Sequence, residues 1–128
     1  MFHEVLLEVK RLEKRYTELG SHQKLADVLI AKVRALWMLL RLEESLEVIN
    51  QCEYVLTHLE QPEEAKKRRV HLIRYKGAIY GLKHDLKRSM EYYQQSLVLA
   101  EEMFTACDLG VIFHNKKRKY LEGGSKIG

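Results

Sequence analysis

Apolar residues recur every three or four positions in six successive segments of the chain, and only short turns separate these segments. This spacing collects apolar side chains on one face of a helix. The single proline, Pro62, stands where a helix should begin, and its missing N–H costs nothing in a first helical turn. No stretch alternates as a strand would. The periodicity therefore predicts an all-α fold of about six helices.

A chain of 128 residues suits one domain. We expect that domain to span residues 1–122. Gly20 should stop the first helix, while Ser21 and Asp85 are N-cap candidates for the second and fifth helices. The expected units are an extra first helix over 4–19, hairpins at about 23–59 and 62–102, a partial third unit over 105–122, and a flexible tail over 123–128.

Small and aromatic residues alternate on the helical stripes of the second hairpin. They are Gly77, Tyr80, Ser89, Tyr93 and Ser96. Small residues on a buried stripe usually mean that another backbone comes close. We interpret Ser89 and Ser96 as positions that admit the first helix of the next hairpin, with Tyr80 and Tyr93 filling the space between.

The second hairpin repeats a pattern that is already present in the first. Leu42, Ser45 and Cys52 align with Leu86, Ser89 and Ser96, and LGVIF at 109–113 starts the pattern a third time. This arrangement resembles the tetratricopeptide repeat family, whose unit is a pair of helices of about 34 residues. The resemblance implies antiparallel helical hairpins stacked as a short right-handed solenoid, since one hairpin cannot bury its apolar stripes alone.

The first copy departs from the family pattern at several points. Arg34 stands where the family has Gly, and the usual proline after the second helix is displaced in the first copy and absent from the second. The first two copies are also about ten residues further apart than the family unit.

The composition limits the chemistry that the chain can support. Two cysteines form no disulfide framework, and no metal-binding or phosphate-loop motif is present. The six histidines are scattered along the chain. We therefore expect no catalytic residue, no metal site and no cofactor. The reduced cysteines and the absence of a signal peptide or a long apolar run indicate a cytoplasmic protein without membrane contact.

The resemblance implies that the first helix of each unit lines a concave surface that binds another protein or peptide. The candidate groove residues are Lys32, Ala35, Leu39, His71, Arg74, Tyr75, Ala78, Asp108, Val111 and Asn115. Some family members hold a C-terminal carboxylate with a Lys/Asn clamp, which is missing here. Of the residues at the matching places, Arg74 alone could pair with a carboxylate.

Two further interpretations concern the second half of the chain. The last predicted helix has no partner helix after it, so Leu109, Ile112 and Phe113 form a candidate surface for assembly into a homo-oligomer. The same half is basic, with 14 Lys and Arg against 8 Asp and Glu, and holds KKRR at 66–69 and KKRK at 116–119. A basic helical domain that binds nucleic acid is the alternative function.

Overall fold

The structure is a computed structural model that describes residues 2–103, and every secondary-structure element in this range is a helix. The predicted helices are confirmed in this part of the chain, each to within two residues of its expected start. The predicted sixth helix and the tail lie outside the described residues. The labelled helices are α1 (Phe2–Leu19), α2 (His22–Met38), α3 (Leu42–Leu56) and α4 (Pro62–Leu82), and a fifth helix covers 86–103.

Local signals explain where most of these helices begin. Pro62 occupies the first turn of α4, followed by Glu63 and Glu64, whose charges favour the positive end of the helix dipole. The Asp85 carboxylate accepts a hydrogen bond from the backbone N–H of Arg88 at 3.2 Å, so it caps the fifth helix as predicted. Ser21 precedes α2 but makes no side-chain capping bond, so the prediction for its side chain is wrong.

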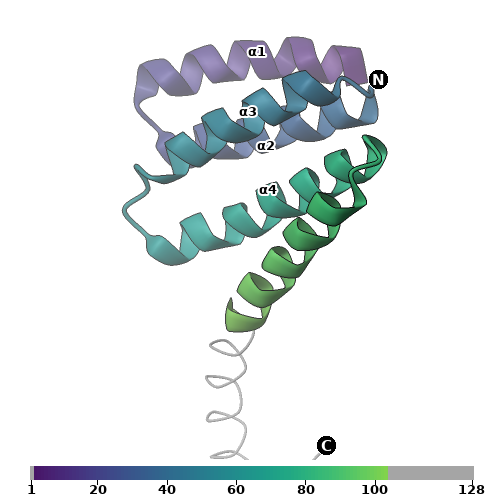
Figure 1. Cartoon of the computed structure of the whole chain (residues 1–128). Helices are drawn as coiled ribbons and strands as arrows, with labels where there is room; N and C mark the ends of the chain where they lie inside the picture. The colour runs from purple at the N-terminus through teal and green to yellow at the C-terminus, as the bar shows by residue number, and fades with distance from the viewer. Residues whose placement is uncertain (1, 104–128) are drawn as a thin grey trace, which may run out of the picture.

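Helix α2 is the centre of the packing. It packs against α1, α3 and α4, and α3 also packs against α4, whereas α1 contacts only α2 among the four labelled helices. Figure 1 shows the helices in succession, from α1 through α2 and α3 to α4 and the fifth helix. The largest fully buried side chains come from three helices: Leu36 and Val33 of α2, Ile49, Leu56 and Cys52 of α3, and Leu72 and Ile79 of α4.

The two hairpins make the same contacts at positions 44 residues apart. The hydroxyl of Ser45 donates to the carbonyl of Val33 at 3.1 Å, and the hydroxyl of Ser89 donates to that of Gly77 at 2.7 Å. Leu40 and His84 occupy the same place in the two turns and share a left-handed backbone, with φ of 60° and 63°. These contacts make Val33 the counterpart of Gly77. The alignment that placed Arg34 at a glycine position is wrong by one residue, because the first hairpin has no glycine to mark it.

The small residues of the second hairpin bring its own two helices together. A β-carbon at Gly77 would lie 3.1 Å from the ring of Tyr93, and one at Gly81 would lie 3.2 Å from the hydroxyl of Ser89. Tyr80 instead stacks on Tyr92, with ring centroids 5.4 Å apart. Ser89 therefore admits the first helix of its own hairpin, and the next hairpin, which Ser89 and Ser96 were expected to admit, lies outside the described residues.

Candidate functional site

A hollow of about 750 Å³ lies between α1, α2 and α4. We call it the main groove. One turn of α1 and successive turns of α2 and α4 form its wall. The lining residues are Phe2, Val5, Asp27, Ile30, Ala31, Arg34, Ala35, Glu64, Lys67, Arg68, His71 and Tyr75.

The main groove has an apolar wall that is only partly covered. Phe2, Val5 and Ile30 are half-buried, as is Tyr75, and Ala31 is exposed. Each therefore keeps apolar surface in contact with water, which a bound apolar side chain would remove from water with a gain in free energy. An apolar wall with polar groups at its edge is typical of a binding site.

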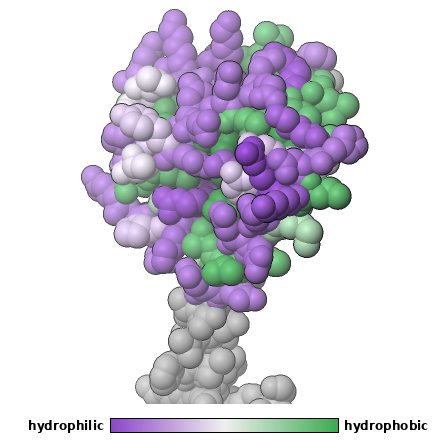
Figure 2. Space-filling view, viewed as in Figure 1, coloured by the Kyte–Doolittle hydropathy of each residue, from purple (hydrophilic) through white to green (hydrophobic). Residues whose placement is uncertain are grey.

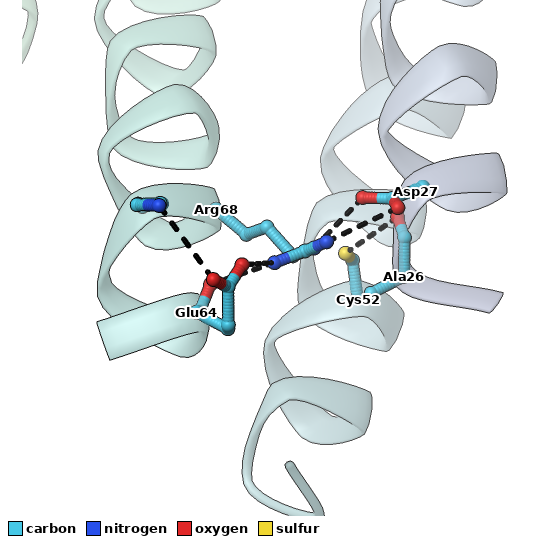
Figure 3. Close-up of polar contacts among 6 residues, drawn as sticks. Ala26, Asp27, Cys52, Glu64 and Arg68 are labelled. Atoms are coloured by element: carbon cyan, nitrogen blue, oxygen red, sulfur yellow. Dashed lines mark hydrogen bonds and ion pairs between the residues drawn. The ribbon is translucent and has the colours of Figure 1, made fainter. Parts of the chain in front are cut away.

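The lining of the main groove includes a cluster of charges around Arg68. Its guanidinium donates to both carboxylate oxygens of Asp27, at 2.7 and 3.1 Å, and to the carboxylate of Glu64 at 2.9 Å (Figure 3). The Arg68 side chain is only 12% exposed. Lys67 adds a longer ion pair to Glu64 at 3.6 Å. This cluster joins α2 to α4 and balances the carboxylates that line the groove.

The hydrogen bond from Arg68 also changes the titration of its partner. It holds the pKa of the Glu64 carboxyl below its usual value, and the nearby charge of Lys67 acts in the same direction. Glu64 therefore keeps its charge to a lower pH than an ordinary glutamate, and the cluster is complete at neutral pH.

One edge of the main groove carries Arg34 and His71, and Arg74 follows three residues further along α4. Arg34, His71 and Arg74 are exposed, and none of them forms an ion pair or a side-chain hydrogen bond with another residue in 2–103. Because the carboxylates of the groove are already paired with Arg68, this edge presents net positive charge at Arg34 and Arg74.

A smaller hollow of about 250 Å³ adjoins the main groove along α4. Its lining residues are Trp37, His71, Arg74, Tyr75, Ala78 and Tyr93. His71 and Tyr75 line both hollows, so the two lie next to each other along α4. Trp37 packs edge-to-face against Tyr75, with ring centroids 5.8 Å apart. Trp37 is the only tryptophan of the chain, so its fluorescence reports on this place alone.

The predicted groove residues are only partly brought together. His71, Arg74, Tyr75 and Ala78 line the two hollows as a group. Ala35 lines the main groove but is 1% exposed, so it belongs to the floor and offers a partner almost no surface. Asp108, Val111 and Asn115, like the assembly residues Leu109, Ile112 and Phe113, lie outside the described residues.

Two other predicted groove residues lie elsewhere. Lys32 pairs with Glu13 of α1 at 2.9 Å, and Leu39 follows the end of α2 without lining either hollow. The sequence reading missed the contribution of α1, which it treated as an extra helix. Val5 belongs to the apolar stripe of α1, but a local pattern does not reveal which distant helix shares a hollow with it.

The first basic run does not form a single positive stripe. Within 66–69, Lys67 and Arg68 pair with Glu64, and Arg68 also binds Asp27 across the helix interface. Two of its four charges are thus balanced within the chain. The second basic run, at 116–119, lies outside the described residues.

Cys52 is a structural thiol rather than a reactive one. Its Sγ lies 3.5 Å from the carbonyl of Ala26, and burial raises the pKa of the thiol to about 12. The reactive thiolate is therefore absent near neutral pH. Among residues 2–103, no three His, Cys, Asp or Glu side chains gather closely enough to hold a metal ion.

No helix within 2–103 has the length and apolar character needed to cross a membrane. Comparison of the chain with protein-family models, with curated proteins and with solved structures gives no match.

Proposed function

We propose that the chain is a non-catalytic protein-interaction module whose ligand is a peptide or helix lying along α4. The supporting observation is that the two hollows lie side by side and combine an apolar wall with the unpaired side chains of Arg34 and Arg74. Such a surface suits a segment that carries apolar side chains and at least one carboxylate.

The stacked arrangement of tetratricopeptide-like hairpins is part of this proposal. It is supported by the packing of α2 against both α3 and α4, which makes the first helices of the two hairpins neighbours. It is also supported by the matching contacts of Ser45 and Ser89. In a stack of this kind the first helices form the concave side, and α2 and α4 supply most of the residues that line the main groove.

A display library of random 12-residue peptides tests the proposal without knowledge of the natural partner. We expect selection on the full chain to enrich peptides with apolar residues and Asp or Glu. Their binding should change the fluorescence of Trp37, whose ring lines the smaller hollow. Ala31→Arg should abolish binding because it fills the main groove, and Arg74→Ala should weaken it about tenfold, as expected for a lost charge-assisted hydrogen bond.

The matched control is Glu47→Arg, which adds the same arginine at an exposed position of α3 that lines neither hollow. Circular dichroism checks that all variants are folded. Enriched peptides that bind the Ala31→Arg and Arg74→Ala variants as tightly as the wild type would contradict the proposal.

Nucleic-acid binding is separated from this function by its dependence on salt. Phosphate contacts release counterions, so affinity for a DNA or RNA duplex should fall steeply between low and physiological salt. Binding of a peptide through apolar contacts changes much less over this range. Steep salt dependence with tight duplex binding would favour the alternative function.

A further inference from the structure

An apolar stripe on the fifth helix is exposed, although the matching stripe on α3 is covered. Leu86, Met90 and Leu97 are 66, 72 and 63% exposed, and Tyr93 is 40% exposed. Figure 1 shows the fifth helix at the lower end of the described residues, and Figure 2, in the same view, shows apolar surface there. Large exposed apolar patches mark sites of protein interaction, because their exposure to water costs free energy.

The first hairpin shows how such a stripe is covered. Forty-four residues earlier, Leu42 and Leu46 pack against the core, and Ile49 is fully buried in it. Both α2 and α4 pack against α3, and Lys76 of α4 pairs with Glu53 of α3 at 2.6 Å. The same face of the fifth helix lacks an equivalent neighbour among the described residues.

The spacing of the exposed stripe identifies the kind of helix that fits it. Leu86, Met90, Tyr93, Leu97 and Ala100 follow one another at steps of four, three, four and three residues. This is the spacing of a coiled-coil seam, which packs best against another helix with the same period. The stripe is also nearly symmetric about Tyr93: when two copies run in opposite directions, Met90 meets Leu97 of the second copy and Tyr93 meets its own counterpart.

The charges beside the stripe have the same symmetry. Lys87, Gln94 and Glu101 are exposed and follow the seam at steps of seven residues on the side away from α4. On the α4 side, the flanking positions are the buried residues Ser89 and Ser96. In an antiparallel pair, Lys87 of each copy lies opposite Glu101 of the other. In a parallel pair, these two residues do not meet.

We propose that a second copy of this chain is the occupant of the stripe, and that the two fifth helices pack antiparallel to form a two-fold symmetric dimer. Both copies use the same surface in this contact, so no further copy can be added through it. It therefore produces a dimer and not a filament. A single pair of helices lies at the low end of interface size, so the dimer is weak and concentration-dependent. This inference does not depend on the main groove between α1, α2 and α4, although Tyr93 of the stripe also lines the smaller hollow.

Sedimentation equilibrium of the full chain, from about 10 µM to about 1 mM, tests the dimer. The wild type should approach twice the 15.1 kDa mass of one chain. Met90→Glu should raise the dimer dissociation constant at least tenfold, because it places a charge within the apolar seam, opposite Leu97 of the second copy. The matched control is Leu7→Glu, since Leu7 of α1 is 73% exposed against 72% for Met90, and it should leave the dimer unchanged.

Charge exchange tests the antiparallel orientation at low ionic strength. Lys87→Glu and Glu101→Lys should each weaken the dimer, because each creates two repulsive pairs. An equimolar mixture of the two variants should recover the wild-type affinity as a heterodimer, since both pairs become attractive again. All variants are first checked for wild-type helicity by circular dichroism.

Several outcomes would overturn the proposal. They are a wild type that is monomeric at every concentration, a dimer that survives Met90→Glu, and equal dissociation by Leu7→Glu. A dimer that Phe113→Glu dissociates and Met90→Glu does not would place the contact at the assembly surface predicted from the sequence. A mixture of charge variants that binds no better than either variant alone would exclude the antiparallel arrangement.

Discussion

Gly77 allows the Tyr93 ring to lie directly against the backbone of α4. Three atoms of that ring would be 3.1 to 3.2 Å from a β-carbon at this position, which is closer than side chains normally approach. Glycine inside a helix costs about 1 kcal/mol relative to alanine, so its use here indicates a packing requirement. The aromatic ring and the missing side chain therefore act as one unit.

Gly77→Leu should destabilise the protein by about 1–3 kcal/mol, because the new side chain displaces the Tyr93 ring and strains the contact between α4 and the fifth helix. Urea unfolding followed by circular dichroism measures the change. Leucine is a good helix former, so a loss of stability reflects packing and not helix propensity.

The control for Gly77→Leu is Ala31→Leu, which adds a similar volume at an exposed position of α2 and should change stability by less than about 0.5 kcal/mol. A double-mutant cycle with Tyr93→Ala then isolates the pair. If Gly77→Leu were equally destabilising with and without the Tyr93 ring, that ring would not be the cause.

At the scale of whole helices, Arg68 is the polar link between α2 and α4. It binds Asp27 of α2 and Glu64 of α4 together, and its side chain is mostly removed from water. Most other ion pairs within 2–103 join residues of one helix turn or lie at exposed positions, where they contribute little. Arg68 is therefore the charged residue whose removal should affect the helix interface most.

Arg68→Met keeps an unbranched side chain but leaves Asp27 and Glu64 without their donor, so we expect a loss of about 1–3 kcal/mol in the free energy of unfolding at pH 7. Arg11→Met is the control. It removes an exposed pair with Glu8 within α1 and should cost less than about 0.5 kcal/mol.

The pH dependence distinguishes loss of the ion pair from loss of packing. The pKa of Glu64 is lowered in the folded protein, so its contribution is present above the ordinary value of 4.5 and is lost as the pH falls toward the lowered pKa. The difference in stability between wild type and Arg68→Met should therefore shrink in acid. A difference that stayed constant across this range would indicate that Arg68 acts through packing alone.

At the scale of the whole described chain, the helices differ in the number of other helices that each packs against. Helix α2 packs against three neighbours, whereas α1 packs only against α2 among the labelled helices. When each element contacts only its neighbours, a terminal element can open without unfolding the rest.

Native-state hydrogen exchange should therefore show α1 opening at a lower free energy than α2 and α3. The Lys32–Glu13 pair links α1 to α2, so Lys32→Met should lower protection in α1 and leave α3 unchanged. Equal protection of α1 and α2 in the wild type would show that the described helices unfold as one cooperative unit.

The sequence predicts the helices better than it predicts their neighbours. Local signals such as Pro62 and Asp85 lie at helix starts, where a single residue satisfies or removes a backbone donor, and both predictions are confirmed. The main groove instead depends on which distant helices meet. Phe2 and Val5 reach it from α1, and no spacing within α1 indicates that α4 lies opposite.

The register of the first hairpin shows the same limit. A glycine at position 77 marks this contact in the sequence, but the valine at the matching position 33 does not. Both positions are defined by a backbone carbonyl that accepts a hydrogen bond from a serine hydroxyl. A contact made by the main chain leaves no constraint on the side chain at that position. The alignment of the two hairpins from the sequence alone therefore placed the counterpart of Gly77 at Arg34, one residue after Val33.

The two left-handed residues at the hairpin turns, Leu40 and His84, bear on how well the sequence suits its own backbone. Both positions have the φ that glycine adopts freely and that other residues adopt at a cost of roughly 1 kcal/mol. Leucine and histidine adopt the same left-handed conformation, so the hairpin and not the residue type determines the geometry of the turn. The free energy of unfolding is thus lower than this fold permits, and a glycine in place of Leu40 or His84 should raise it.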